Sequence, residues 1–170
     1  MESKKNLVLV GMMGSGKSTI GSILSKKLQF QFIDIHKKIE ESEREKITTI
    51  FEKKGESYFR KLEEKITTNI LASKNQVVSL GGGGFINKNI RYLVLKSNIS
   101  FWLNWKNITL INRISKNNKR PLAFKHSKEE LRDIILERSK IYNKANYKIN
   151  CQNLNKNEIV DRIINIYEKI

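Results

Sequence analysis

Short apolar runs alternate along the chain with segments in which apolar residues recur every three or four positions. The runs are rich in Val, Ile, Leu and Phe, residues that favour buried β-strands. We predict strands at 6–10, 30–34, 76–80, 99–103 and 147–151. Strands that alternate with helices indicate an α/β fold built on a parallel sheet.

The remaining periodic segments are predicted to be helices, because a spacing of three to four residues places apolar side chains on one helix face. Gly55 is expected to break the helical pattern, and Ser127 with Glu130 has the spacing of a capping box. The predicted helices cover 19–28, 36–42, 48–53, 56–72, 88–95, 107–115, 127–142 and 156–169.

The length and the cysteine content favour one cytoplasmic domain. A chain of 170 residues suits a single domain at 1–170, and no apolar run reaches the roughly 20 residues that span a bilayer. The first residues lead directly into the first strand, which leaves no room for a signal peptide. Cys151 is the only cysteine, so we expect no internal disulfide and a buried strand residue in a reducing cytoplasm.

The chain has a net charge of +16, with 33 Lys and Arg residues against 17 Asp and Glu residues. The lysines are spread along the whole chain and interleaved with glutamates, as in 40–46, and no arginine-rich stripe occurs. Charge alone is a weak signal of nucleic-acid binding. We therefore expect neither a nucleic acid nor a membrane as partner, and the even charge favours a monomer.

Residues 11–18, Gly-Met-Met-Gly-Ser-Gly-Lys-Ser, match the phosphate-binding pattern G-x-x-x-x-G-K-[ST] between the first predicted strand and the first predicted helix. Glycines let backbone N–H groups approach phosphates, and a helix N-terminus adds partial positive charge. Lys17 is expected to reach the β- and γ-phosphates, and Ser18 to ligate Mg²⁺. The motif predicts binding of ATP or GTP. The ATP contacts assigned to it are Gly14, Ser15, Gly16, Lys17, Ser18 and Thr19.

Two further strands end at the same edge of the sheet, which is where open α/β sheets bind ligands. Asp34 ends the second strand and Ser79 lies near the end of the third. Either side chain is suited to hold a water of the Mg²⁺ shell or to orient an acceptor hydroxyl. The glycines at 81–84 remove side chains beside the strand end, so that a small ligand can lie against the backbone.

These pieces together resemble the shikimate kinases over essentially the whole chain. Besides the loop at 11–18, the matching stretches are 32–34, 55–63, 79–83, 120–122 and 138–142, in the family's order and spacing. The resemblance implies a P-loop NTPase-type three-layer sandwich with a five-stranded parallel sheet flanked by helices. It also implies a substrate-binding helical segment at about 35–62 and a mobile lid at about 114–126, where a polar stretch holds the only proline.

The reaction that the resemblance implies is ATP-dependent phosphorylation of the 3-hydroxyl of shikimate, with Lys17, Asp34 and Arg120 as catalytic residues. Asp34 is expected to order the metal shell. Arg120 resembles the lid arginine that closes over the phosphates, neutralises their charge and excludes water. Arg113, seven residues before it, resembles a residue that packs on the adenine.

The resemblance also implies how the acceptor is bound. Arg60 and Arg138 are expected to grip the carboxylate of shikimate, because a planar guanidinium binds a carboxylate in a bidentate manner. Glu63 is expected to hold Arg60 in place. Gly82 and Gly83 are expected to contact the same substrate through the backbone.

One position departs from the family pattern, which has Asp-x-Asp after the second strand, whereas this chain has Asp34-Ile35-His36. The second aspartate binds ring hydroxyls of the substrate and is the candidate base. A neutral histidine offers one acceptor but is still able to take a proton. His36 is therefore compatible with a working shikimate kinase, with a kinase of another small hydroxy acid such as a gluconate-like sugar acid, or with a weakened or non-catalytic nucleotide-binding homologue. A further interpretation is that His36 lies on the helix and points away from the site.

Overall fold

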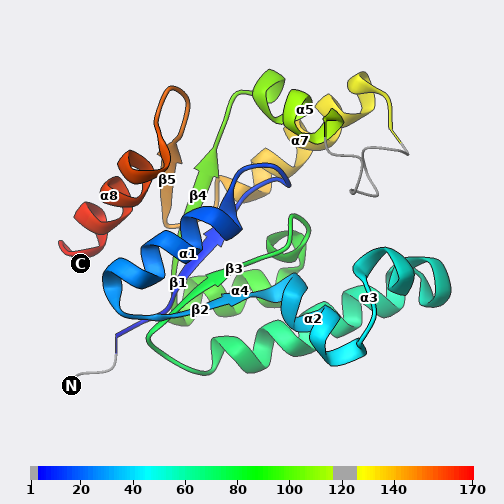
Figure 1. Ribbon diagram of the computed structural model, residues 1–170, viewed down its shortest axis with the longest axis horizontal. Helices are drawn as coiled ribbons and strands as arrows, with labels where there is room; N and C mark the ends of the chain where they lie inside the picture. The colour runs from blue at the N-terminus through cyan, green and yellow to red at the C-terminus, as the bar shows by residue number, and fades with distance from the viewer. Residues whose placement is uncertain (1–3, 117–125) are drawn as a thin grey trace.

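The computed structural model describes residues 4–116 and 126–170, and within them five parallel strands form one sheet (Figure 1). The strand order is β2-β3-β1-β4-β5. This result confirms the predicted α/β fold with a five-stranded parallel sheet. The strands are β1 (Leu7–Val10), β2 (Gln31–Asp34), β3 (Gln76–Ser79), β4 (Ile99–Asn104) and β5 (Tyr147–Asn150).

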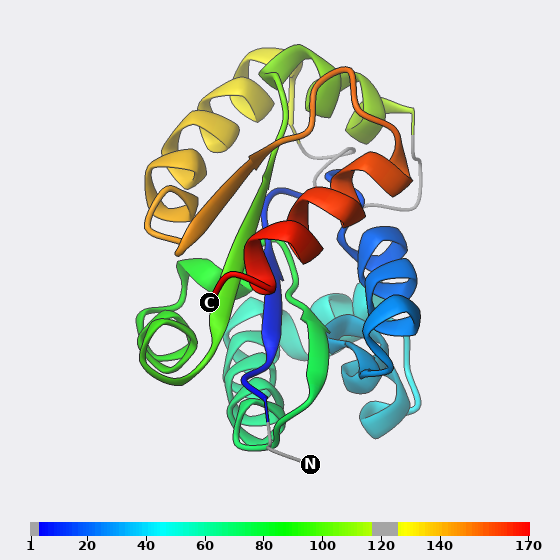
Figure 2. The ribbon, with the colours of Figure 1, turned by 90° about the vertical axis from the view of Figure 1, so that its left-hand side faces the viewer.

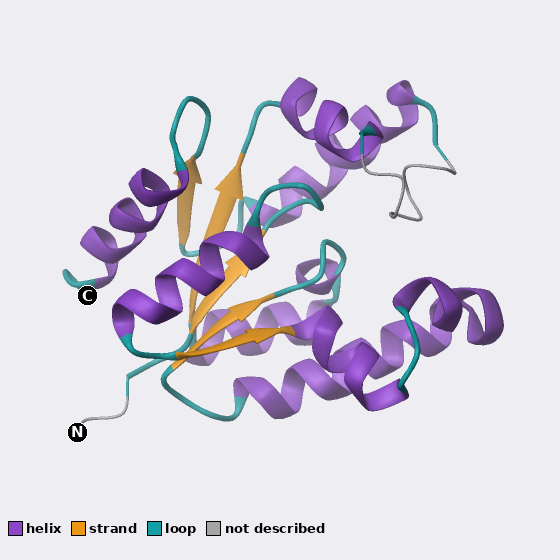
Figure 3. Cartoon of the chain, in the orientation of Figure 1, coloured by secondary structure: helices purple, strands orange, loops and turns teal. Residues whose placement is uncertain are grey.

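Helices cover both faces of this sheet and give the predicted three layers (Figures 2 and 3). The helices α1 (Lys17–Leu28) and α8 (Lys156–Tyr167) pack on one face. The elements whose apolar residues belong to the core of the other face are α2 (Ile35–Glu43), α3 (Ile47–Leu71), the short 3-10 helix η1 (Gly84–Ile86), α4 (Lys88–Ser97), α5 (Asn107–Ser115) and α7 (Lys128–Tyr142).

The central strand β1 shows how the sequence builds two cores. Leu7 and Leu9 point into the core beneath α1 and α8, while Val8 and Val10 point into the core on the other face. All four side chains are fully buried. A parallel strand covered on both faces is apolar throughout, which is why this strand is a continuous hydrophobic run.

Gly55 breaks α3, as the sequence predicts, although the helical segments on its two sides adjoin directly. Its φ of 78° and ψ of 169° are non-helical, and a side chain is rarely compatible with such a φ. Two other local predictions are confirmed: Ser127 and Glu130 form a capping box at the start of α7, and Cys151 is buried directly after β5.

Most of the predicted lid at 114–126, including Arg120, lies outside the residues that the structure describes. In the described ranges 4–116 and 126–170, no helix is both long and apolar enough to cross a membrane.

Candidate active site

The phosphate-binding loop connects the end of β1 to the start of α1, as its sequence pattern requires. Gly14 and Gly16 adopt φ values of 80° and 89°, which glycine tolerates and side chains rarely do. The N-cap residue of α1 is Gly16, and no side chain within 4–116 or 126–170 caps this helix end. The first N–H groups of this helix therefore remain suited to binding phosphate oxygens.

Lys17 lies inside the loop and is largely buried, with a relative exposure of 8%. Its Nζ donates to the carbonyl oxygens of Gly11 and Met12, at 2.8 and 3.0 Å. The ammonium group is thus held at the concave side of the loop, where the sequence predicts a phosphate contact.

Ser18 and Asp34 form an oxygen pair at the carboxyl edge of the sheet. The hydroxyl of Ser18 donates to Oδ2 of Asp34 at 2.5 Å. The other oxygen, Oδ1, accepts from the backbone N–H groups of His36 and Lys37 at 3.1 and 3.3 Å, so Asp34 also caps α2. This second role fixes the carboxylate and explains why α2 begins directly after β2.

The donor set at this edge fits Mg²⁺. A hydroxyl and a carboxylate are hard oxygen ligands, and Mg²⁺ commonly binds to one or two protein oxygens, waters and nucleotide phosphates. Among the described residues no cluster of three or more His, Cys, Asp or Glu side chains is arranged to hold a metal. The arrangement therefore resembles a nucleotide-dependent Mg²⁺ site more than a metal site built from protein ligands.

A cavity of about 820 Å³ opens on one side of the loop. It is lined by residues of the loop and α1, by the ends of β2 and β3, by α2 and by the start of α3. Asp34, His36, Ser79 and Gly82 are among its lining residues. The sequence-predicted acceptor residues at these strand ends are thus brought to one place.

Arg60 is held beside the glycine run by Glu63, as the resemblance implies. Its Nη1 donates to Oε2 of Glu63 at 2.7 Å, and its Nη2 lies 3.2 Å from Oε1 of Glu56. A Cβ added to Gly83 would lie only 2.5 Å from Nη1 of Arg60, so the guanidinium rests directly against that glycine. Any other residue at position 83 would displace the guanidinium from this place.

Glu63 is a buried carboxylate, with a relative exposure of 1%, between Arg60 and His36. Burial alone would raise the pKa of Glu63, but the neighbouring His36 imidazole and the Arg60 guanidinium outweigh it and hold the pKa below its usual value. Glu63 therefore carries a negative charge inside the site.

His36 lies in the site, so the interpretation in which it points away is wrong. Its Nε2 is 3.5 Å from Oε1 of Glu63, and its ring packs edge-on against Phe59. A Cβ on Gly81 would lie 2.1 Å from Nε2, so the imidazole occupies the space beside that glycine. Neither Nε2 nor Oε1 of Glu63 has a hydrogen-bond partner among the described residues.

Helix α7 brings Arg138 to the same glycine run. Its Nη1 is 3.8 Å from Sδ of Met12, and a Cβ on Gly82 would lie 3.7 Å from Nη1. Tyr142, one turn further along, donates its hydroxyl to the carbonyl oxygen of Gly82. Burial raises the pKa of Tyr142 to about 12, so this hydroxyl stays a donor and fixes the glycine backbone.

Tyr142 has no functional role in the sequence analysis. The helical spacing of Leu131, Ile135 and Tyr142 indicates a core face, and all three are buried. Nothing local in the sequence signals a contact with Gly82, which lies 60 residues earlier.

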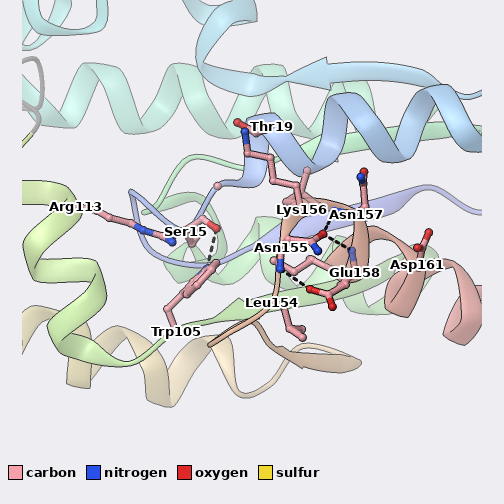
Figure 4. A pocket seen from close by; sticks show the side chains of 13 residues that line it. Ser15, Thr19, Trp105, Arg113, Leu154, Asn155, Lys156, Asn157, Glu158 and Asp161 are labelled. Atoms are coloured by element: carbon pink, nitrogen blue, oxygen red, sulfur yellow. Dashed lines mark hydrogen bonds between the residues drawn. The ribbon is translucent and has the colours of Figure 1, made fainter.

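A second cavity, of about 660 Å³, opens beside the loop and contains Arg113 (Figure 4). Arg113 donates to the carbonyl oxygen of Gly14 at 3.2 Å and stacks on Trp105, with 3.8 Å from its Cζ to the ring centroid. Ser15, Gly16 and Thr19 line the same cavity. Four residues that the sequence predicts to bind ATP, namely Ser15, Gly16, Thr19 and Arg113, thus line one cavity. Trp105 lines it as well and was not predicted from the sequence.

The two cavities share Gly16 and Thr19, so the phosphate-binding loop lies between them. The cavity on one side of the loop contains the stacked guanidinium of Arg113, and the cavity on the other side is lined by His36 and by the glycines at 81 and 82. Arg60 and Arg138 do not line that second cavity but lie against the same glycine run. This arrangement is suited to transferring a phosphoryl group from a nucleotide on one side to a small acceptor on the other.

The comparisons with known proteins agree with this geometry. The family model for shikimate kinase matches residues 13–168. The shikimate kinase of Sulfurihydrogenibium sp. (strain YO3AOP1) is 44% identical over 94% of this chain and 96% of its own length. That of Bacillus subtilis (strain 168) is 40% identical over 95% of this chain and 88% of its own length.

Solved structures give the same result. The structure of shikimate kinase from Acinetobacter baumannii in complex with shikimate superposes with a TM-score of 0.92 and 28% identity, and the match covers 99% of this chain and 95% of that one. A gluconokinase from Sinorhizobium meliloti 1021 has a TM-score of 0.60 at 17% identity, which shows a shared fold alone.

Proposed function

This chain belongs to the shikimate kinase family, and we propose that it transfers the γ-phosphoryl group of ATP to the 3-hydroxyl of shikimate, giving shikimate 3-phosphate and ADP. The observation that supports it best is the phosphate-binding loop between two cavities, with Arg60 and Arg138 at adjacent glycines on the acceptor side. A gluconate-like acceptor is not favoured, because the gluconokinase shares only the fold.

On the nucleotide side, Lys17 contacts the β- and γ-phosphates and the N–H groups of the loop cradle them. Ser18 supplies an oxygen ligand for Mg²⁺, and Asp34 orders the surrounding waters. The chemistry that Mg²⁺ supplies when bound is neutralisation of the charge on the β- and γ-phosphate oxygens. Arg120, outside the described residues, stays a prediction as the arginine that closes over the phosphates.

On the acceptor side, Arg60 and Arg138 bind the carboxylate of shikimate, and Gly82 and Gly83 contact the substrate through the backbone. Glu63 fixes Arg60 with a charge-assisted hydrogen bond. The guanidinium of Arg60 is therefore already oriented before the substrate binds. Such preorganisation lowers the entropic cost of placing the acceptor hydroxyl in line with the γ-phosphate.

His36 occupies the position of the second aspartate in the family pattern. We propose that it binds the ring hydroxyls of the substrate. A proton on Nε2 faces the Glu63 carboxylate, which leaves Nδ1 as the acceptor for a hydroxyl. Because phosphoryl transfer depends mostly on positioning and electrostatics, one neutral acceptor at this position is compatible with turnover.

The monomeric state expected from the even charge stays a prediction. A cytoplasmic location and the absence of a nucleic-acid partner stay predictions.

The test is ADP release from ATP and Mg²⁺ with and without shikimate, for the native protein and for His36→Asp. We expect strong shikimate dependence in the native protein, and phosphorus–proton NMR of the product should place the phosphate on the 3-oxygen. ADP release that does not respond to shikimate in the native protein would refute the function. A response that appears only in His36→Asp would show that the site has changed its acceptor or lost activity.

A further inference from the structure

We propose that Trp105 is a nucleotide-positioning residue. It stacks on the Arg113 guanidinium, and this stacked pair, which we call the platform, binds the base of ATP. Trp105 also connects the platform to the phosphate-binding loop by a hydrogen bond. The proposal rests on the proposed function, in which the cavity beside Arg113 receives ATP. Trp105 follows directly after β4, and Arg113 lies on α5, so one short stretch of chain carries both residues.

The stack between the two side chains is close. The Cζ atom of Arg113 is 3.8 Å from the centroid of the Trp105 ring, well within the range of a favourable cation–π contact. Such a contact covers one face of the planar guanidinium and leaves the other for a second flat group. Both residues line the cavity, so a base that enters it completes a sandwich of ring, guanidinium and base.

Two hydrogen bonds tie this pair to the loop. Nε1 of Trp105 donates to the carbonyl oxygen of Ser15 at 2.9 Å, and Nη1 of Arg113 donates to that of Gly14 at 3.2 Å. Figure 4 shows Trp105 and Arg113 directed toward Ser15. Because these two carbonyls are engaged by the platform, the loop and the platform form one unit that fixes the base relative to the phosphates.

At the start of α8, on the opposite wall of the cavity, two side chains form a helix cap. Oδ1 of Asn155 accepts from the N–H groups of Asn157 and Glu158, and the Glu158 carboxylate accepts from the N–H of Asn155 (Figure 4). These groups are committed to capping the helix. The stacked pair, in contrast, presents a flat guanidinium face, which is the shape that a base stacks on.

The experiment is titration calorimetry of two probes, ADP and inorganic tripolyphosphate, with the native protein, Trp105→Phe and Trp105→Leu. Phenylalanine keeps a ring face and loses the hydrogen bond, whereas leucine loses both. We expect Trp105→Leu to weaken ADP binding about two- to fivefold, the loss of one cation–π contact to the exposed Arg113 side chain. Tripolyphosphate, which has no base, should bind both variants as tightly as it binds the native protein.

Activity and fluorescence supply independent readouts. In Trp105→Leu the KM for ATP should rise by a similar factor while kcat and the KM for shikimate stay unchanged. Binding of ADP should change the tryptophan fluorescence of the native protein, and Trp105→Phe should lose that change, because the other tryptophan, Trp102, is buried in the core. Thermal melts of both variants control for folding.

Native ADP affinity in Trp105→Leu would overturn the proposal. Equal losses for ADP and tripolyphosphate would also overturn it, since Trp105 would then only brace the loop. Native protein that binds ADP but does not phosphorylate shikimate would refute the proposed function and leave the ADP test of Trp105 intact. Native protein that binds neither probe would refute both.

Discussion

Replacing Glu63 with glutamine tests the central electrostatic contact of the acceptor site. The change keeps the size of a side chain that is 1% exposed but removes its charge. Its partners are Arg60, at 2.7 Å, and His36, at 3.5 Å. Because these partners hold the pKa of Glu63 below its usual value despite burial, the carboxylate stabilises the folded state, and neutralising it must destabilise the protein.

The magnitude follows from the bond that changes. A hydrogen bond to a charged group contributes about 1.5–3 kcal/mol and a neutral one about 1 kcal/mol, so Glu63→Gln should cost about 0.5–2 kcal/mol. With a urea dependence of about 2 kcal/mol per molar, the unfolding midpoint should fall by about 0.25–1 M. The KM for shikimate should rise about three- to tenfold, since Arg60 loses its charged anchor, while the KM for ATP stays unchanged.

The pH dependence gives a second signature. A carboxyl whose pKa is lower in the folded state than its ordinary value of 4.5 adds stability above that value and loses it as the pH falls through the folded-state pKa. The stability difference between native protein and Glu63→Gln should therefore be largest near neutral pH and shrink below about pH 4.5.

The matched control is Glu137→Gln, at an exposed ion pair with Lys140, where we expect a change within about 0.5 kcal/mol. Urea unfolding at several pH values and steady-state kinetics make the comparison. If Glu63→Gln has native stability and a native KM for shikimate, the reasoning about this buried charge is wrong.

Three further predictions concern single positions. Lys17→Met should abolish turnover while circular dichroism and the unfolding midpoint stay native; undiminished turnover would contradict the role of Lys17. Gly81→Ala should raise the KM for shikimate and leave the KM for ATP unchanged. The reason is that the added Cβ would lie 2.1 Å from Nε2 of His36 and displace the imidazole ring. Equal effects on both constants would contradict the placement of His36 in the acceptor site. Gly55→Ala should lower the free energy of unfolding, measured in urea, by about 1–2 kcal/mol. A positive φ strains alanine, although no atom obstructs the added Cβ. An unchanged unfolding midpoint would show that the backbone at residue 55 relaxes without cost and would contradict this prediction.

Much of the fold could be predicted because its signals are local. The strand at 7–10 is apolar throughout because both of its faces are covered, and Gly55 marks a helix break through its own φ. The phosphate-binding loop is likewise a local motif. Its neighbours in sequence, a strand and a helix, are the elements that position it in the structure.

The contacts of Trp105 and Tyr142 could not be predicted, because they depend on residues far apart in the chain. Trp105 bonds to Ser15, 90 residues earlier, and Tyr142 to Gly82, 60 residues earlier. In the sequence Trp105 follows an apolar run and Tyr142 lies on the apolar side of a predicted helix, and neither position indicates its distant partner. The strand order, which places β1 beside both β3 and β4, is what brings these pairs together.

The structure also changes the expected effect of His36 on the charge of the acceptor site. From the sequence, histidine in place of aspartate removes a carboxylate from the acceptor site. In the structure a carboxylate remains there, because Glu63 is buried against both Arg60 and His36. The substitution therefore replaces an acid that would repel Glu63 with a group that attracts it, and it leaves the site one charge more positive. A more positive site favours an acceptor that carries a carboxylate. We therefore propose that His36 strengthens binding of such an acceptor, while it contributes less than an aspartate to activating the hydroxyl.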